Sequence, residues 1–237
     1  MQRAFYHEYP KIFSLETEVL DAAPGRLLLA ASPFFAGGGG QLADRGLLRW
    51  AGGETTVAGF EIIEGRNWVL LPTQAAITGK VEAVVDAPFR RMMTEMHTYT
   101  HILNACVYQS FDGALVTGVQ MNDDGTARMD FDLPYADNDK LRALEAPING
   151  AIEEDLRVSD SYVPLVQAQD EPGLIRTRSV APPLTADGMI RIVEIAGLDR
   201  QACGGTHLPS TRGEKRLRIV KIDNKGRHNR RVRVALL

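Results

Sequence analysis

The sequence predicts an α+β protein, with an all-β N-terminal part followed by a part that mixes long helices with hairpin-forming strands. Short apolar or alternating runs separated by turn residues fill the first 85 positions. One long amphipathic segment follows, and helical and strand-like segments then alternate to the C-terminus. Because 237 residues suffice for two small domains, we expect one domain over residues 1–85 and a second over residues 86–237.

The first domain is expected to be a small barrel or sandwich, since its strands are short and regularly separated by turn signals. Turn residues stand at Pro24-Gly25, at Gly52-Gly53 and at residues 64–67. The expected strands lie at residues 27–30, 47–50, 54–63, 68–71 and 76–85.

A run of four glycines at residues 37–40 lies inside this domain and is followed by Gln41. Such a run most often forms a flexible loop tip, because ordering glycine costs much backbone entropy. The alternative is a loop whose bare backbone approaches a ligand closely, with Gln41 as its polar tip. The run is not a P-loop, because no Gly-Lys-Ser/Thr follows it.

A long helix is expected from Asp86 to about Ser110, with Asp86 as the N-cap and Pro88 in the first turn. An apolar stripe at helical spacing marks its core-facing side. The stripe comprises Met92, Met96, Tyr99, Leu103 and Cys106. At about 100° per residue, His97 and His101 fall on the opposite side of the helix. We therefore expect one face to pack on a sheet and the other to line a cleft.

The rest of the second domain is expected to combine strands with a further helix. Residues 115–120 and 126–133 flank a turn signal and form a hairpin. A second helix begins at Asp137 and can kink at Pro147 or Gly150. The remaining expected elements are strands at 161–166, 189–195, 215–222 and 230–236, and a turn or short helix at 171–176.

Two ligand-spaced pairs of residues predict a metal site. His97 and His101 are four residues apart and lie on one face of the expected helix. Cys203 and His207 bracket a glycine-bearing loop. Each pair alone is a weak signal, but together they form the four-ligand Cys/His set that suits one Zn²⁺. A metalloprotease of the H-E-x-x-H type is excluded, because Thr98 follows His97.

The last part of the chain is strongly basic. Nine Lys and Arg face two acids from Glu214 to the end, a balance of +7 in a chain whose net charge is -3. Such a run is either a solvated face or a surface for a phosphate backbone. The position of the run directly after the Cys203 loop favours a surface that binds a phosphate backbone. In the final strand, arginines at 231 and 233 alternate with valines at 232 and 234, so one face is cationic and the other apolar.

Composition excludes several classes of protein. The N-terminus lacks the apolar run of a signal peptide, and no stretch approaches the 18 or so apolar residues that span a membrane. Two cysteines, Cys106 and Cys203, provide no disulfide framework. We therefore expect a cytoplasmic protein with reduced thiols.

The motifs taken together resemble a known family. Their order along the chain is residues 38–41 (GGGQ) with 44–46 (DRG), His97-x-x-x-His101, residues 172–176 (PGLIR), residues 203–207 (CGGTH), and residues 220–226 and 229–236 of the basic strands. This combination is similar to the AlaX group of alanyl-tRNA editing proteins, free-standing relatives of the editing domain of alanyl-tRNA synthetase. The glycine-rich N-terminal module resembles the longer AlaX type.

The resemblance implies a small N-terminal β-barrel followed by an α+β editing domain with an antiparallel sheet and long helices. It implies Zn²⁺ at His97, His101, Cys203 and His207. It also implies ATP-independent hydrolysis of misacylated tRNA(Ala), chiefly Ser-tRNA(Ala) and in second place Gly-tRNA(Ala). Departures from the usual pattern are Ala36 before the glycines, Tyr99, and Ile102-Leu103 after the second histidine.

Candidate roles follow for individual residues. Gln41, Thr98, Cys203 and Thr206 are the candidates for contact with the reacting ester, although the two threonines equally suit helix packing or local turn bonding. Phosphate contacts are assigned to Arg216, Arg218, Lys221, Lys225, Arg230, Arg231 and Arg233. Zinc either activates water or holds the substrate, and His207 is a tight ligand only if the site is closed. No general base is evident, since Glu95 points unfavourably.

Two other functions compete with editing. A non-catalytic tRNA-binding module with structural zinc would bind tRNA without turnover. A zinc hydrolase of a small ester or amide would not need the basic strands, so its turnover would not depend on salt in the way a tRNA enzyme's does. No membrane and no stable protein partner is expected in any of these cases.

Overall fold

The computed structural model describes residues 3–135, 137–176, 184–185 and 187–237. Contacts between residues group the chain into two units, Met1–Gly38 with Leu42–Met92 and Gly39–Gln41 with Met93–Leu237. Each unit contains antiparallel sheet, and helices accompany the sheets, so the α+β class is confirmed. The predicted domain division after residue 85 stays a prediction.

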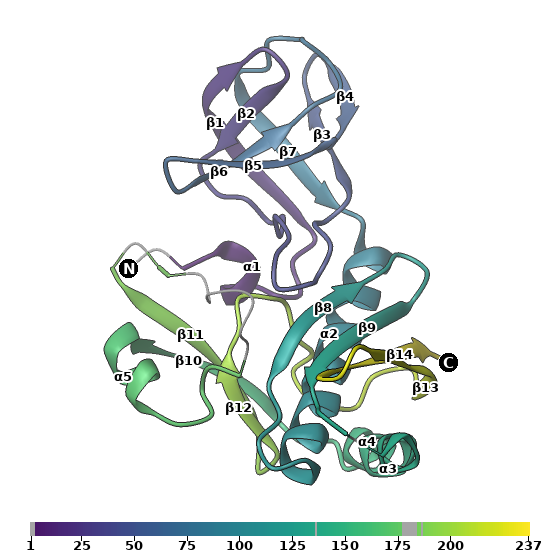
Figure 1. The fold of residues 1–237 in the computed structure, drawn as a ribbon. Coiled ribbons are helices and arrows are strands. Elements are labelled where there is room, and N and C mark those ends of the chain that lie inside the picture. Colours follow the sequence, from purple (N-terminus) through teal and green to yellow (C-terminus); the bar gives the residue numbers. More distant parts are fainter. Residues whose placement is uncertain (1–2, 136, 177–183, 186) are drawn as a thin grey trace. The chain divides into compact units, whose positions relative to one another are not determined.

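The first unit is built on one curled, seven-stranded antiparallel sheet, drawn in purple to blue in Figure 1. Its strands run in the order β4-β3-β7-β1-β2-β6-β5. Their bounds are β1 (Ser14–Ala23), β2 (Arg26–Leu29), β3 (Gly46–Trp50), β4 (Gly53–Thr56), β5 (Gly59–Ile63), β6 (Arg66–Leu70) and β7 (Gly79–Val85), and a short helix α1 (Phe5–Glu8) precedes them. No pairing joins the edge strands β4 and β5 in the described part of the chain, so closure into a barrel stays a prediction.

The sequence located most of these strands but not all of them. Strand β1 was missed, because its alternation carries acidic and small residues rather than an apolar run. The single strand expected at 54–63 is two strands, β4 and β5. The apolar side chains of the sheet form one core that includes Leu27, Phe34, Leu48 and Val69.

A buried ion pair fixes the two ends of the glycine-rich loop within the first unit. Asp44 accepts a hydrogen bond from the Phe35 amide at 2.7 Å and another from Arg90 Nε at 2.7 Å. Arg90 also donates to the carbonyl of Pro33 at 2.9 Å. Because a buried charge must be paired, Asp44 and Arg90 hold Pro33 and Phe35 close to Asp44.

Helix α2 (Ala87–Ser110) is the long helix that the sequence predicts. Asp86 caps it by accepting the Phe89 amide at 3.1 Å, which confirms the predicted start. Met96, Tyr99 and Leu103 of the predicted stripe are fully buried. The unit boundary at Met92 falls inside this helix.

The second unit carries two antiparallel sheets. The four-stranded sheet has the order β13-β14-β9-β8, and the three-stranded sheet has the order β10-β11-β12. Their bounds are β8 (Val116–Met121), β9 (Thr126–Asp132), β10 (Val158–Pro164), β11 (Met189–Ile195), β12 (Asp199–Ala202), β13 (Leu217–Lys225) and β14 (Asn229–Leu236). Helix α2 passes behind β8 and β9 in Figure 1.

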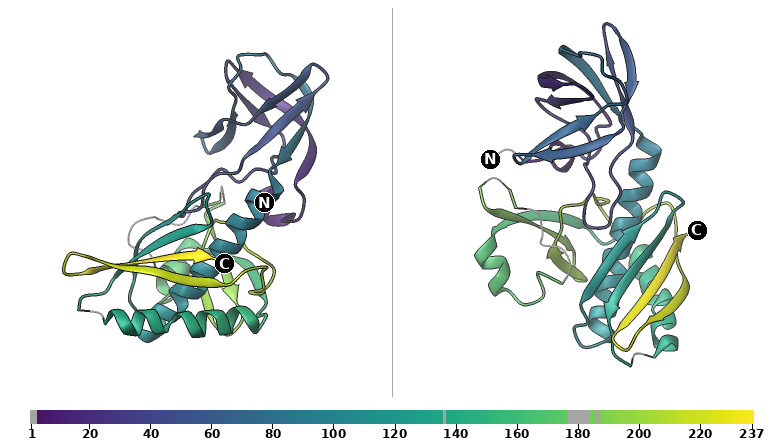
Figure 2. Two further views of the ribbon diagram at one scale, coloured as in Figure 1. Left: turned by 90° about the vertical axis from the view of Figure 1, so that its right-hand side faces the viewer. Right: turned by 45° about the horizontal axis from the view of Figure 1, so that its top comes forward.

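The other helices of this unit are short. They are α3 (Asn138–Ala143), α4 (Glu145–Glu153) and α5 (Leu165–Asp170), and Figure 2 shows α3 and α4 running below the β13–β14 hairpin. The predicted second helix is therefore interrupted, but at Leu144 rather than at Pro147 or Gly150. Pro147 lies in the first turn of α4, where its missing N–H costs little. Residues 171–176 form the predicted turn.

Within the second unit the histidine side of α2 is covered rather than open. His97 and His101 are 4% and 6% exposed, so the expectation that this face lines a cleft is wrong. The 203–207 loop packs on His97, and side chains of β12 bond to His101 and Asn104. Helical periodicity locates the side opposite a stripe, but it does not report what packs there.

Among the described residues, none of the helices is long and apolar enough to cross a membrane.

Candidate metal centre

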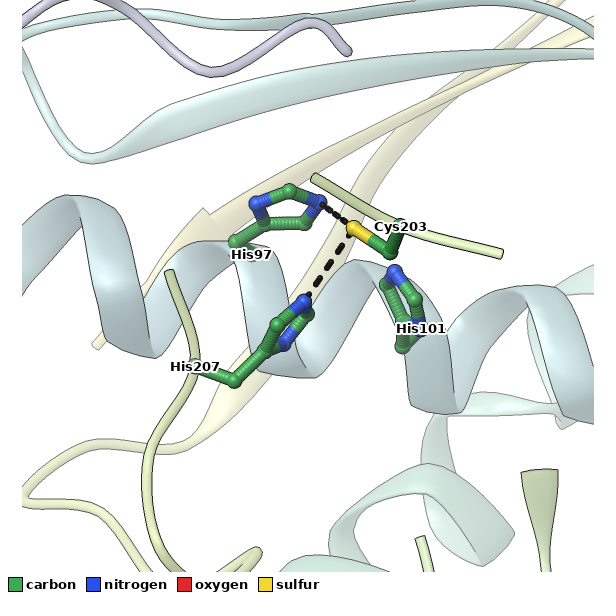
Figure 3. A group of neighbouring side chains, drawn as sticks. All are labelled: His97, His101, Cys203 and His207. Carbon is green, nitrogen blue, oxygen red and sulfur yellow. Dashed lines mark hydrogen bonds between the residues drawn. The ribbon is translucent and has the colours of Figure 1, made fainter. Parts of the chain in front are cut away.

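His97, His101, Cys203 and His207 come together in the second unit, as predicted from the two pairs. Their ligand atoms all lie within 4.8 Å of one another. Cys203 Sγ is 3.4 Å from His97 Nε2 and 3.3 Å from His207 Nε2. Figure 3 shows the sulfur between the imidazole rings, with His101 completing the group.

Local structure explains how each pair reaches this point. His97 and His101 lie one turn apart on α2, with ring centroids 5.2 Å apart. Cys203 directly follows β12, and its amide donates to the Arg191 carbonyl at 3.0 Å. The loop can pass over His97 because residue 205 is glycine. A Cβ there would lie 2.0 Å from His97 Cε1.

The outer nitrogen of each imidazole contacts an oxygen that can accept its proton. The three contacts are His97 Nδ1 to Gln41 Oε1 at 2.8 Å, His101 Nδ1 to Asp199 Oδ2 at 3.1 Å, and His207 Nδ1 to Thr98 Oγ1 at 3.4 Å. Metal-binding histidines in proteins usually donate their second N–H in this way. The three Nε2 lone pairs are then available on the side of Cys203.

The cluster is electrostatically coupled. Burial alone would raise the pKa of the Cys203 thiol, but the three neighbouring imidazoles hold it well below its usual value. Burial, together with the positive charges of His97 and His101, lowers the pKa of His207. Burial would also lower the pKa of His101, but the Cys203 thiolate and the hydrogen bond to Asp199 outweigh it and raise that pKa to about 9. The group therefore favours a thiolate balanced by positive charge.

The residues fit a soft or borderline divalent metal. A tetrahedral ion with zinc-like bond lengths places its sulfur and nitrogen ligands about 3.5 Å apart, close to the 3.3 and 3.4 Å found here. One thiolate and three imidazoles suit Zn²⁺ and related transition metals, whereas Mg²⁺ and Ca²⁺ prefer oxygen ligands. The group therefore has the donor chemistry of a metal centre.

Comparison with known proteins identifies the family. The model of the threonyl and alanyl tRNA synthetase second additional domain matches residues 190–233. An alanyl-tRNA editing protein AlaX-M of Saccharolobus solfataricus is 30% identical over 237 residues, with 98% of both chains covered. This chain belongs to the AlaX-M family of alanyl-tRNA editing proteins.

Other relatives agree with this assignment. The AlaX-M protein of Methanosarcina acetivorans is 36% identical over 159 residues, which cover 67% of this chain and 63% of that one. The alanine–tRNA ligase of Cutibacterium acnes is 30% identical over 229 residues, which cover 91% of this chain and 25% of the ligase. Membership of the AlaX-M family confirms the predicted resemblance and the prediction of an editing enzyme.

The glycine-rich loop brings Gln41 into the metal centre of this AlaX-M chain. All four glycines at 37–40 have positive φ values, between 59° and 128°, which other residues rarely adopt. A Cβ on Gly40 would lie 2.8 Å from the Val119 carbonyl oxygen, and the Gly40 carbonyl accepts the Met121 amide at 2.8 Å. The loop therefore lies in close contact with β8 at Gly40, and close approach of its backbone to a bound ligand stays a prediction.

Gln41 itself is 3% exposed and bonded on both sides of its amide. Its Oε1 accepts from the Thr206 amide at 3.0 Å in addition to His97. Its Nε2 donates to Thr206 Oγ1 at 2.8 Å. Gln41 thus lies beside the candidate metal ligand His97 and not at an exposed loop tip. Its catalytic role stays a prediction.

The two candidate threonines are also placed beside ligands. Thr98 Oγ1 donates to the Thr94 carbonyl at 2.9 Å and accepts the Leu208 amide at 3.0 Å, next to His207 Nδ1. Thr206 is buried, with its hydroxyl 2.7 Å from that of Thr94. Both hydroxyls tie the 203–207 loop to α2, and a role in chemistry stays a prediction for each.

The side chains predicted to contact tRNA differ in exposure, and several of the exposed ones also pair with carboxylates. Val232 and Val234 are fully buried, which confirms the predicted alternation of β14. Arg230 is only 8% exposed, however. Arg231 is held by Asp130 through two hydrogen bonds of 2.7 Å. The exposed members of the set are Arg216, Arg218, Lys221, Lys225 and Arg233.

Sequence reasoning missed Asp199 and Gln201, which lie beside His101. Gln201 Nε2 donates to Asp199 Oδ2 at 2.7 Å, and Arg176 Nη1 donates to Asp199 Oδ1 at 2.8 Å. The alternation of side chains along β12 could have identified these two residues. Asp199, Gln201 and Cys203 are two residues apart, so in an extended strand they point to one face.

Proposed function

We propose that this chain hydrolyses the ester of misacylated tRNA(Ala), chiefly Ser-tRNA(Ala) and secondarily Gly-tRNA(Ala), as a free-standing zinc-dependent editing enzyme. One observation carries the proposal. His97 and His207 present Nε2 to the Cys203 thiolate, and His101 lies in the same group of ligand atoms. This group occurs in a chain that aligns along almost its whole length with an AlaX-M editing protein. The free cysteines Cys106 and Cys203 suit the expected cytoplasmic location.

His97, His101, Cys203 and His207 would hold the zinc ion. When bound, zinc supplies Lewis acidity, which either activates a water molecule or holds the substrate. Four protein ligands favour the holding role, because closed sites leave no position for water. Gln41 and Thr98 would keep the ligands oriented through their contacts with His97 and His207.

Hydrolysis also needs a group that accepts a proton from water, and Glu95 is unsuited to this role. Its carboxylate accepts from Tyr99 Oη at 3.1 Å and from the Lys215 amide at 2.8 Å. Glu95 is 6% exposed, so these bonds occupy it inside the protein. We infer that a hydroxyl of the substrate relays the proton from water to the departing ester oxygen.

The outer face of the four-stranded sheet would carry the tRNA backbone. In the pairing of β13, β14 and β9, Lys221, Arg233 and Arg128 stand directly opposite one another. Like charges in register are destabilising unless an anion lies between them. The neighbouring row of Asp223, Arg231 and Asp130 provides two carboxylates for four cations. The remaining positive charge is suited to phosphate.

We also propose the two domains expected from the sequence, a β-barrel at residues 1–85 and an editing domain at residues 86–237 whose one long helix is α2. The seven-stranded curled sheet supports the first. The four ligands and the basic strands, which all lie after residue 85, support the second.

The test is a deacylation assay with Ser-, Gly- and Ala-tRNA(Ala), with and without a chelator. We expect Ser-tRNA(Ala) to be hydrolysed fastest, Ala-tRNA(Ala) to be spared, and the chelator to abolish turnover. Binding of tRNA without turnover would favour the non-catalytic module. Turnover of a small ester that does not change with salt would favour the small-molecule hydrolase.

A further inference from the structure

Asp199 is a buried carboxylate that contacts one of the four candidate metal ligands, His101. Its side chain is fully buried. Oδ2 lies 3.1 Å from His101 Nδ1 and accepts from Gln201 Nε2 at 2.7 Å, while Oδ1 accepts from Arg176 at 2.8 Å. Oδ1 therefore binds Arg176, whereas Oδ2 faces His101 and Gln201.

The contact with His101 determines which imidazole nitrogen carries a proton. Two groups lie 3.1 Å from His101 Nδ1, namely Asp199 Oδ2 and Gln201 Nε2. Gln201 Nε2 donates to Asp199 Oδ2, which is closer to it at 2.7 Å. Because a carboxylate accepts hydrogen bonds, His101 Nδ1 then donates to Asp199. In a neutral imidazole the other nitrogen, Nε2, then has a free lone pair. This is the nitrogen that faces Cys203 across the cluster (Figure 3).

Arg176 and Gln201 hold the Asp199 side chain in this orientation. Arg176 neutralises its charge, which a buried carboxylate requires. The Gln201 amide is oriented by Asn104, whose Nδ2 donates to Gln201 Oε1 at 3.0 Å, so that the Gln201 amino group points at Asp199. Because β12 alternates, the strand that ends at Cys203 also delivers Asp199 to the same face.

We infer that Asp199 is a positioning residue, which holds His101 in the tautomer that can bind a metal ion through Nε2. This inference rests on the metal site of the proposed function. Gln41 and Thr98, the partners of His97 and His207, are neutral. A carboxylate partner raises the basicity of the imidazole as well as orienting it. His101 is therefore the ligand most dependent on its partner.

A purely structural role for Asp199 makes a different prediction. In that case the carboxylate would serve only to pair with Arg176. Arg176 has other contacts, since its Nε donates to the Gly173 carbonyl at 2.8 Å and its guanidinium lies 4.2 Å from the Tyr108 ring centroid. Replacing Arg176 and replacing Asp199 would then have equal effects, whereas under our inference the Asp199 variant is much the more severe.

Three variants separate these cases, with zinc affinity measured by competition with a chelator. Asp199→Asn should weaken zinc binding roughly 10- to 100-fold, the usual effect of losing such a partner. Arg176→Gln should weaken it less, because the His101 contact survives. Asp130→Asn is the matched control, since Asp130 is also a largely buried partner of an arginine but lies away from the ligands. It should leave zinc affinity unchanged.

A measurement on the unmodified protein avoids dependence on the folding of variants. In zinc-loaded protein labelled with ¹⁵N-histidine, NMR should show His101 protonated at Nδ1 and ligated through Nε2. Protonation at Nε2 would overturn the inference, and so would an Asp199→Asn protein that binds zinc as tightly as Asp130→Asn. These readouts do not involve tRNA, so a failure of deacylation with intact zinc binding would count against the proposed substrate and not against Asp199.

Discussion

Gly205→Ala tests how closely the 203–207 loop is fitted to the metal centre. A Cβ at this position would lie 2.0 Å from His97 Cε1, 2.3 Å from His97 Nδ1 and 2.9 Å from Gln41 Oε1. Non-bonded Cβ contacts are not found below 3.0 Å, so the ring or the loop must move by at least the missing 1.0 Å. Metal sites tolerate ligand displacements of only about 0.2 Å. We therefore expect His97 to be lost as a ligand.

The magnitude follows from two separate effects. Zinc affinity should fall by more than the roughly 10- to 100-fold that changes in outer contacts cost, because a ligand itself is displaced. Overpacking should lower the free energy of unfolding by about 1–3 kcal/mol, which lowers Tm by roughly 2–4 °C per kcal/mol in a chain of this size. Chelator competition measures the first effect and thermal unfolding the second.

Gly150→Ala is the matched control for this substitution. A Cβ at Gly150 meets nothing within 4 Å, and the residue lies inside α4. Alanine in a helix interior is favoured over glycine by about 0.5–1 kcal/mol, so this variant should be slightly more stable and should bind zinc normally. If Gly205→Ala also bound zinc with unchanged affinity, the close fit of the loop on His97 would be refuted.

Three further predictions concern the metal, the loop and the basic sheet. Cys203→Ala removes the only thiolate of the cluster, and elemental analysis should find less than the one zinc per chain expected of the unmodified protein. Gln41→Ala leaves His97 Nδ1 and a buried amide without an acceptor. It should lower both zinc affinity and Ser-tRNA(Ala) turnover, and no change in either would show that the loop is dispensable. Replacing Arg128 and Arg233 with Gln should weaken tRNA binding and reduce its salt slope by about one for each lost phosphate contact. Arg142→Gln, which removes an exposed arginine of α3, should do neither, and equal behaviour of the two proteins would argue against the sheet as the tRNA face.

Elements with strong local signals could be predicted from the residues alone. The cap at Asp86, the stripe through Met96 and Leu103, and the i,i+4 spacing of His97 and His101 depend only on helical geometry, which local residues specify. The four ligands were found in the same way, as two spaced pairs. Breaks within elements were harder to place, as at Leu144, because they depend on how each short segment packs.

Which side chains support the ligands, and which cations remain exposed, depends on contacts between elements that are far apart in the sequence. Asp199 and His101 are 98 residues apart, and Gln41 and Thr206 are 165 residues apart, so no local period connects them. The pairing of β14 with β9 likewise occupies Arg231 with Asp130 and leaves Arg233 more exposed. Periodicity specifies the direction of a side chain along its own element, whereas its partner depends on which other element packs against that face.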